Sequence, residues 1–240
     1  MAERIQQARK LLAEARSIAV LTGAGVSAES GVPTFRGAGG LWRQYRPEDL
    51  ATPEAFARDP KLSWEWYDWR RGLIAAVHPN AGHDALAELE RRVASFTLIT
   101  QNVDGLHQRA GSRNVLEVHG SIWMLRCTLC KREWEDLSAS LEIPPHCECG
   151  GLARPGVVWF GENLNPRVWA AAEQAVHSCD VLVVAGTSAV VYPAAGLAPL
   201  AREAGAHIIE VNLETTPLSQ SVDYSFQARS GELLPQLLER

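Results

Sequence analysis

The sequence lacks any apolar run that approaches the roughly 18 residues needed to cross a membrane, and its first residues are charged rather than apolar. A membrane span and a secretory signal peptide are therefore not expected, and the acidic residues Glu3 and Glu14 argue against a transit peptide. We expect a soluble, cytoplasmic protein that does not act at a membrane.

The chain also lacks an excess of basic residues. Its 23 lysines and arginines stand against 28 acidic residues, which gives a formal net charge of −5. There is thus no general electrostatic reason for it to bind nucleic acid or an anionic membrane. Internal repeats and low-complexity segments are absent as well. A length of 240 residues, 46% hydrophobic and 21% charged, fits one large globular domain with or without a smaller insert.

Cysteine is scarce, with five in the chain, and four of the five lie between positions 127 and 149. This clustering predicts a metal site in a reducing compartment rather than a disulfide framework. The pairs Cys127-x-x-Cys130 and Cys147-x-Cys149 suit a tetrahedral, closed, structural zinc site. The second pair has one intervening residue instead of the usual two, so His146 is an alternative to Cys147, although we favour four cysteines.

The fifth cysteine, Cys179, follows a predicted helix and is interpreted as a buried, inert thiol. A zinc ribbon that binds nucleic acid is the competing interpretation of the cysteine cluster. Lys131 and Arg132 are offset by the acidic residues that follow them, so no basic patch forms. The zinc is therefore expected to stabilise the fold and to do no chemistry.

Short apolar runs alternate along the chain with amphipathic helical patterns. Such strands, apolar on both faces and separated by helices, predict an α/β fold with a doubly wound, Rossmann-like parallel sheet. The predicted strands cover residues 17–22, 96–100, 115–118, 181–185 and 208–211, and helices are predicted over 3–16, 82–92 and 166–178.

Two stretches interrupt this alternation. Residues 37–80 hold four of the eight tryptophans without a strand-like run and are predicted to form a helical insertion. Residues 120–155 hold the clustered cysteines and are predicted to form a small zinc-binding domain. The Rossmann-like domain would then consist of residues 1–36, 81–119 and 156–240.

A glycine-rich loop, Thr22-Gly-Ala-Gly-Val-Ser-Ala-Glu-Ser-Gly-Val-Pro-Thr-Phe-Arg36, follows the first predicted strand. Gly23 and Gly25 would let the backbone approach a pyrophosphate, which the start of the next helix attracts. The acidic ribose-binding residue of dehydrogenases has no convincing strand end on which to lie, so phosphate binding is expected but an ordinary dehydrogenase is not. Taken alone, Phe35 and Arg36 are interpreted as a packed aromatic residue and a surface cation.

Polar residues also follow the other predicted strands. These segments are Gln101-Asn-Val-Asp104, His119, Gly186-Thr-Ser188 and Asn212-Leu-Glu214. Ligands of open α/β sheets bind outside the carboxyl ends of the strands, whereas the plainer interpretation is helix capping and turn formation. Among the histidines, His119 is the preferred general base because it would face this crevice, and His107 is interpreted as structural.

Taken together, these blocks resemble the sirtuins, which are NAD-dependent protein deacylases. The resemblance rests on the glycine-rich loop and on six further blocks in the same order: Thr100-Gln-Asn-Val-Asp-Gly-Leu-His107, Val118-His-Gly120, Cys127-x-x-Cys130, Pro155-x-Val-Val-Trp-Phe-Gly-Glu162, Gly186-Thr-Ser188 and Val211-Asn-Leu213. It extends from about residue 10 to the C-terminus and implies that NAD is consumed as a co-substrate.

The resemblance also implies roles for individual residues. His119 and Asn102 would be catalytic, Asp104 would hold the nicotinamide amide, and Gln101 would contact the nicotinamide ribose. The implied NAD-binding residues are Gly23, Ala24, Gly25, Ser27, Ala28, Glu29, Thr34, Phe35, Arg36, Trp42, Gln101, Asn102, Val103, Asp104, Gly186, Thr187, Ser188, Asn212, Leu213, Glu214 and Ser230.

One block points to the acyl group. Tyr67 and Arg70 are three residues apart on a predicted helix and would share a face, so the phenol and the guanidinium could hold a carboxylate together. The plainer interpretation is a helix with buried aromatics and solvated arginines. The block resembles the Tyr-x-x-Arg of the class III sirtuin branch, which removes succinyl, malonyl and glutaryl groups, and Ala51 suits a roomy acyl pocket. The implied substrate-binding residues are Tyr67, Arg70, Val157, Val158, Phe160, Gly161 and Glu162.

The sequence therefore predicts an NAD-dependent deacylase that removes acidic acyl groups, and acetyl, from protein lysines and releases nicotinamide and 2′-O-acyl-ADP-ribose. A general deacetylase or an ADP-ribosyltransferase is the alternative within the enzyme class. An oxidoreductase would leave the cysteines, His119 and Arg36 unexplained, and a non-enzymatic zinc module would turn over no NAD. The expected partner is an acylated lysine in a protein substrate, with no specific nucleic acid and no membrane.

Overall fold

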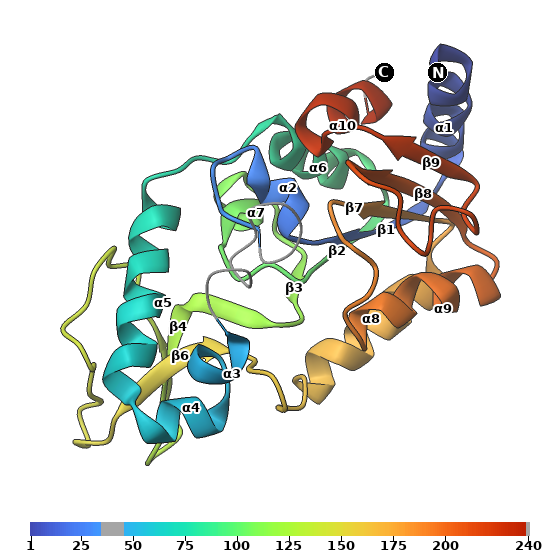
Figure 1. The fold of residues 1–240 in the computed structure, drawn as a ribbon. Coiled ribbons are helices and arrows are strands. Elements are labelled where there is room, and N and C mark those ends of the chain that lie inside the picture. The colour runs from blue at the N-terminus through green and yellow to red at the C-terminus, as the bar shows by residue number, and fades with distance from the viewer. Residues whose placement is uncertain (35–45, 239–240) are drawn as a thin grey trace.

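A computed structural model describes residues 1–34 and 46–238 of the protein (Figure 1). These residues contain a six-stranded sheet in the order β3-β2-β1-β7-β8-β9, in which all neighbouring strands are parallel. The strands are β1 (Ser17–Thr22), β2 (Ser95–Thr100), β3 (Val115–Glu117), β7 (Val181–Ala185), β8 (His207–Asn212) and β9 (Tyr224–Gln227). The order reverses direction between β1 and β7, as in a Rossmann fold, which confirms the predicted fold class.

Helices cover both faces of this sheet (Figure 1). On one face lie α1 (Ala2–Glu14), α6 (Ala81–Arg92) and α10 (Ser230–Leu238), and on the other lie α8 (Pro166–Ser178) and α9 (Leu197–Glu203). Because side chains alternate along a strand, Ile18 and Val20 of β1 enter one core and Ala19 and Leu21 enter the other. The sheet is thus buried on both sides, which explains its continuous apolar runs.

A second body contains a three-stranded antiparallel sheet with the order β5-β4-β6. Its strands are β4 (Gly120–Cys127), β5 (Glu133–Glu135) and β6 (Ala153–Val157), and helices α3 (Pro47–Leu50), α4 (Pro53–Arg58) and α5 (Pro60–Ala75) accompany it. Trp64 and Trp66 of α5 share one hydrophobic core with Ile122 and Leu125 of β4. The aromatic stretch and the cysteine-containing stretch therefore pack together, although they lie far apart in the sequence.

Helices α4 and α5 begin at residues that favour a helix start. The Thr52 hydroxyl accepts a hydrogen bond from the Ala55 N–H at 3.0 Å, and the Asp59 carboxylate accepts one from the Leu62 N–H at 2.9 Å. A proline follows each of these two caps, where its missing N–H costs nothing. The Thr52 cap therefore fixes the first residue of α4, and the Asp59 cap fixes the first residue of α5.

Parts of the fold differ from the sequence predictions, and helices α9 and α10, for example, were not among the predicted helices. Strand β9 was not predicted, because Tyr224–Gln227 is short and has two polar residues. Strand β6 spans the limit at residue 155 that the sequence set between the zinc-binding domain and the Rossmann-like domain. The domain limits stay a prediction. Among the described residues, no helix is both long and apolar enough to cross a membrane.

Candidate active site

The point where the sheet reverses direction brings two glycine turns into contact. The Gly25 N–H donates a hydrogen bond to the Gly186 carbonyl oxygen at 2.8 Å. A Cβ on Gly25 would lie 2.8 Å from the Gly186 Cα, and a Cβ on Gly186, which has a φ of +60°, would lie 2.3 Å from the Val26 nitrogen. Only glycine fits at these two positions, which explains both sequence motifs.

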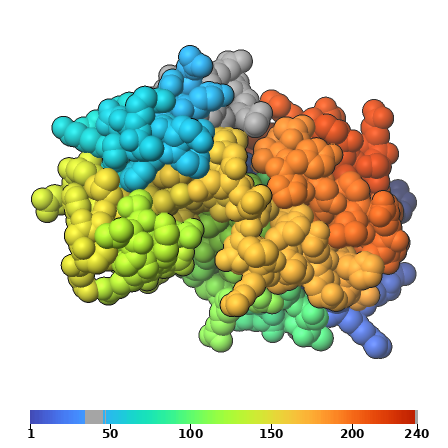
Figure 2. Space-filling model, turned by 90° about the horizontal axis from the view of Figure 1, so that it is seen from below, coloured from blue at the N-terminus to red at the C-terminus, as the bar shows by residue number. Residues whose placement is uncertain are grey.

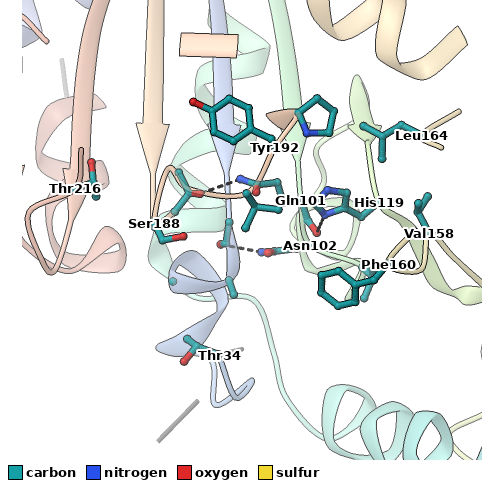
Figure 3. A pocket seen from close by; sticks show the side chains of 18 of the residues that line it. Thr34, Gln101, Asn102, His119, Val158, Phe160, Leu164, Ser188, Tyr192 and Thr216 are labelled. Atoms are coloured by element: carbon teal, nitrogen blue, oxygen red, sulfur yellow. Dashed lines mark hydrogen bonds between the residues drawn. The ribbon is translucent and has the colours of Figure 1, made fainter. Parts of the chain in front are cut away.

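A cavity of about 890 Å³ opens at the carboxyl ends of the strands, between the two bodies that Figure 2 shows side by side. In Figure 3, Ser188 and Thr216 lie toward one end of this cavity, and Val158, Phe160 and Leu164 lie toward the other. Asn102 and His119 lie between these two ends. The cavity is thus elongated and runs across the ends of the strands.

His119 follows β3 and lines this cavity. Its Nδ1 lies 3.1 Å from the Gln101 carbonyl oxygen. A carbonyl can only accept, so this contact requires the proton on Nδ1 and leaves the Nε2 lone pair free for another partner. Burial lowers the pKa of His119. The hydrogen bond to Gln101 acts in the opposite direction but is the smaller effect, so the pKa lies below its ordinary value. The imidazole is therefore neutral at neutral pH, as a general base requires.

Asn102 is held from three directions. Its amide Nδ2 donates hydrogen bonds to the Gly23 carbonyl oxygen and to the Ser27 hydroxyl, each at 3.1 Å, and its main-chain N–H donates to the Thr100 hydroxyl at 3.0 Å. The Ser27 hydroxyl also lies 3.3 Å from His83 Nε2 and forms a hydrogen bond with Asp104. A buried polar network thus orients the Asn102 side chain at the edge of the cavity.

Gln101 links two strand ends. Its Nε2 donates a hydrogen bond to the Thr187 hydroxyl at 2.9 Å, which joins the segment after β2 to the segment after β7. Side-chain hydrogen bonds also hold the loop after β8 in place. The buried Glu210 carboxylate accepts hydrogen bonds from the hydroxyls of Thr216, Ser219 and Ser225. Side-chain hydrogen bonds therefore hold the loops at the rim of the cavity in place.

Most residues that the sequence assigned to NAD do line the cavity. These are Gly23, Ala24, Gly25, Thr34, Gln101, Asn102, Val103, Gly186, Thr187, Ser188, Asn212, Leu213 and Glu214. Phe35, Arg36 and Trp42 lie outside the described residues.

Five other assigned residues are absent from the lining of the cavity: Ser27, Ala28, Glu29, Asp104 and Ser230. Three of them make internal hydrogen bonds instead. Ser27 supports Asn102, the Glu29 carboxylate accepts the Gly231 N–H at 2.9 Å, and Asp104 accepts the Leu106 N–H at 2.9 Å. Burial raises the pKa of Asp104, and the Leu106 N–H, Ser27 and Arg70 oppose that shift. In this structure these three residues do not line the cavity, and their hydrogen bonds hold the neighbouring segments in place.

Val158, Phe160, Gly161 and Glu162, which the sequence assigned to the substrate, line the cavity, whereas Val157 is buried in the hydrophobic core of the second body. The Glu162 carboxylate is held by Arg154, with its two oxygens 2.6 and 2.8 Å from the guanidinium nitrogens, and by the Trp159 N–H at 2.8 Å. Its hydrogen bonds therefore shape the loop that carries Phe160, which is 47% exposed.

Tyr67 and Arg70 lie one turn apart on α5, both buried. The structure brings them together as the sequence predicts, but neither is among the residues that line the cavity. Burial raises the pKa of Tyr67 to about 12, although Arg70 acts to lower it. Tyr67 is therefore protonated at neutral pH. The Arg70 guanidinium lies over the Trp66 ring, 5.0 Å from its centroid, and also interacts electrostatically with Asp104.

Three groups of lining residues are not among those predicted from the sequence. They are Trp159 with Asn163, Leu164, Pro166 and Trp169, then Val191, Tyr192 and Pro193, and finally Thr215 and Thr216. Each group adjoins a recognised motif, so extending each motif by a few residues would have found most of them.

The four clustered cysteines form a candidate metal site. Their sulfur atoms all lie within 4.8 Å of one another, with 3.5 Å between Cys127 and Cys149 and 3.8 Å between Cys130 and Cys147. Zinc–sulfur bonds of about 2.3 Å in a tetrahedron place sulfur atoms about 3.8 Å apart, so the cluster fits one structural zinc. A Cβ on Gly151 would lie 2.9 Å from the Cys127 sulfur, which shows how closely the chain wraps the site. His146 is not part of this cluster.

Comparisons with known proteins agree with this geometry. Residues 23–193 match the model of the Sir2 family. NAD-dependent protein deacylase 2 of Pyrobaculum aerophilum is 56% identical over 230 residues, which cover 95% of this chain and 92% of that protein. The dog protein NAD-dependent protein deacylase sirtuin-5, mitochondrial, is 46% identical, covering 96% of this chain and 83% of that protein. A crystal structure of a Sir2 homologue–NAD complex superposes with a TM-score of 0.92 at 52% identity, covering 97% of this chain and 92% of that chain.

Proposed function

The chain belongs to the Sir2 family and is an NAD-dependent protein deacylase, and we propose that it removes succinyl and malonyl groups, together with acetyl, from lysines of protein substrates. The products would be the free lysine, nicotinamide and 2′-O-acyl-ADP-ribose. The observation that carries the acyl preference is the buried pair of Tyr67 and Arg70 on one face of α5, of which Tyr67 is hydrogen-bonded to the cavity-lining Trp159. The 46% identity to a protein named sirtuin-5 is consistent with this preference.

The cavity offers NAD a continuous surface. The turns at Gly25 and Gly186 would approach the phosphates, and the loop at Asn212–Thr216 would hold the adenosine. Asn102 would contact the nicotinamide ribose, and the network behind it would keep its amide in place. Bound NAD would supply the ribose carbon that accepts the acyl oxygen as nicotinamide leaves.

His119 would act as the general base on a ribose hydroxyl. Its Nε2 lone pair is free because the Nδ1 proton is directed to the Gln101 carbonyl oxygen. The same contact fixes the orientation of the ring. Removal of the hydroxyl proton by a neutral imidazole would allow the ribose oxygen to attack the acyl carbon. The C–N bond to lysine would then break, which frees the lysine amine, and addition of one water molecule would leave the acyl group as an ester on the ribose.

Tyr67 and Arg70 would recognise the carboxylate of an acidic acyl group. Arg70 provides the charge and Tyr67 a protonated phenol that can donate. A hydrogen bond to a charged group is worth roughly 1.5–3 kcal/mol, which corresponds to about a 10- to 100-fold preference over acetyl-lysine. The cysteine cluster, which does not line the cavity, would hold zinc and stabilise the second body.

The partner would be an acylated lysine in a protein. The net charge of −5 gives no reason to add nucleic acid or an anionic membrane to the partners. The clustered, unbonded cysteines support a reducing compartment, so we also propose a cytoplasmic location.

The proposed reaction is tested by NAD-dependent turnover of one peptide carrying either succinyl-lysine or acetyl-lysine, with nicotinamide and the acyl-ADP-ribose followed by mass spectrometry. We expect both peptides to be turned over and His119→Tyr to abolish deacylation of both. Retained deacylation by His119→Tyr would contradict the assignment of the base. Absorbance of NADH without nicotinamide release would indicate an oxidoreductase instead.

A further inference from the structure

The hydroxyl of Tyr67 accepts a hydrogen bond from the indole of Trp159. The distance between Trp159 Nε1 and Tyr67 Oη is 2.9 Å, and both side chains are buried, with exposed fractions of 3% and 2%. Within the described residues this is the one side-chain hydrogen bond that Tyr67 makes. A phenol has a single proton, so an oxygen that accepts from Trp159 must direct its own proton elsewhere.

The indole of Trp159 is itself held in place. The Arg154 guanidinium lies over its ring, 3.4 Å from the centroid, and Arg154 is paired with Glu162 through two hydrogen bonds. Phe56 packs against the same indole with 5.2 Å between ring centroids. The direction of the Nε1–H is therefore set by the packing around the ring and does not depend on a bound substrate.

We propose that Trp159 is a positioning residue for acidic acyl groups, because its Nε1–H occupies the acceptor side of the Tyr67 hydroxyl and turns the phenolic proton toward the acyl carboxylate. This inference rests on the proposed function, since it requires that Tyr67 and Arg70 bind that carboxylate. Trp159 thus links the loop of residues 158–162 to the acyl pocket through one hydrogen bond.

The physical gain is preorganisation. Burial keeps the phenol protonated, with a pKa of about 12, so Tyr67 can only donate to a carboxylate and cannot itself become an anion there. Without the Trp159 N–H, the hydroxyl could rotate and its proton would have to be reoriented when the substrate binds. An acetyl group has no carboxylate and gains nothing from this orientation, so the effect should be confined to acidic acyl groups.

The experiment measures kcat/KM for matched succinyl-lysine and acetyl-lysine peptides with saturating NAD. Trp159→Phe keeps an aromatic ring and removes the N–H. We expect the ratio of succinyl to acetyl kcat/KM to fall about five- to tenfold, mainly through KM of the succinyl peptide, as the loss of one neutral hydrogen bond predicts. Trp134→Phe, the same substitution in a half-buried residue of β5, should leave the ratio unchanged.

A double-mutant cycle separates positioning from packing. In a Tyr67→Phe background the acceptor is gone, so Trp159→Phe should have no further effect on the ratio. An equal effect of Trp159→Phe in both backgrounds would overturn the proposal, because Trp159 would then act by packing alone. An unchanged ratio in Trp159→Phe, with a lowered ratio in Tyr67→Phe, would overturn it as well.

Failure of the underlying function gives a different result. If neither Tyr67→Phe nor Arg70→Met changes the ratio, the proposal that these two residues bind an acidic acyl group is wrong. Tyr67 would then donate to no acyl carboxylate, and Trp159 would have no such donor to position. If Trp159→Phe does not fold, replacement of Trp159 by 3-benzothienylalanine keeps the shape of the ring and exchanges N–H for sulfur. The same five- to tenfold fall is then expected, and an unchanged ratio in that variant would overturn the proposal.

Discussion

The Ser27 hydroxyl accepts hydrogen bonds from two directions, from the Asn102 amide at 3.1 Å and from His83, whose Nε2 lies 3.3 Å away. The main-chain N–H of Asn80 donates to His83 Nδ1 at 3.3 Å, so the His83 proton must be on Nε2 and point to Ser27. Ser27 in turn forms a hydrogen bond with Asp104. One buried hydroxyl therefore joins the glycine-rich loop, the segment after β2 and helix α6.

Ser27→Ala should lower activity more than its position outside the cavity suggests. The substitution removes one of the two acceptors of the Asn102 amide, the acceptor of His83 Nε2 and one of the donors to Asp104. Loss of the partner of a buried polar group costs about 1–3 kcal/mol. We expect kcat of the deacylase reaction to fall at least tenfold and the free energy of unfolding to fall by a similar 1–3 kcal/mol. Ser30→Ala, in the same loop but without contact to Asn102, serves as the control. Wild-type kcat in Ser27→Ala would show that the network does not orient Asn102.

The buried histidines should make the protein less stable in mild acid. Burial lowers the pKa of His83 from 6.5 to about 4 and lowers that of the adjacent His107 well below its usual value. Both are neutral in the folded protein, so the unfolded chain binds protons first as the pH falls. The free energy of unfolding is thus unaffected by His83 above about pH 6.5. It falls as the pH drops from 6.5 to 4, by on the order of 3 kcal/mol for His83.

Chemical unfolding at pH 7.5, 6, 5 and 4.5 measures this loss. Burial raises the pKa of Glu117 to about 7, and this group has the opposite sign because it lowers stability as the pH rises. A comparison with a variant therefore isolates the histidine. The slope of stability against pH should be smaller in His83→Gln than in the wild type, and equal slopes in the two proteins would rule out His83 as the source.

The contact between the glycine turns predicts a sharp loss of NAD binding when one of them is substituted. A Cβ on Gly25 would lie 2.8 Å from the Gly186 backbone, so Gly25→Ala must separate the ends of β1 and β7. We expect the affinity for NAD, measured by calorimetry, to fall at least tenfold. Gly196→Ala is the matched control because a Cβ there has no neighbour within 4 Å. Unaltered NAD affinity in Gly25→Ala would exclude this turn as part of the phosphate site.

Zinc removal should unfold the second body and reduce activity only indirectly. Cys147→Ser is expected to lower the zinc content well below one per chain and to lower Tm, since metal affinity in such sites is coupled to folding. His146→Ala should keep one zinc per chain, because His146 lies outside the cysteine cluster. Zinc content is measured by elemental analysis. A stoichiometric zinc in Cys147→Ser, together with its loss in His146→Ala, would show that His146 is the fourth ligand.

The sequence predicts the parts of this protein that depend on local patterns. Continuous apolar runs such as Val181–Ala185 predict the parallel strands, because a strand buried on both faces leaves no polar position. The pairing of Tyr67 with Arg70 follows from helical spacing in the same way. The burial of Arg70 could not be predicted, since it depends on β4 and β6, which pack on α5 from distant parts of the chain.

The features of the site that could not be predicted depend on contacts between segments that are distant in the sequence. The hydrogen bond from Trp159 to Tyr67 joins residues 92 positions apart, and no periodicity in the sequence indicates it. Glu162 and Glu29 were assigned to ligands because they belong to recognised motifs, yet their carboxylates bind Arg154 and the Gly231 N–H in this structure. A motif locates a functional segment, but it does not tell which of its polar side chains face the cavity and which support it.

The central claim is that Arg70 selects an acidic acyl group, and the most direct test is the ratio of kcat/KM for succinyl-lysine and acetyl-lysine versions of one peptide in wild type and Arg70→Met. Arg58→Met, which removes an exposed arginine at the end of α4, is the control. We predict that the ratio falls about 10- to 100-fold in Arg70→Met and is unchanged in Arg58→Met, because one charge-assisted hydrogen bond is lost. The same ratio in wild type and Arg70→Met would contradict the account.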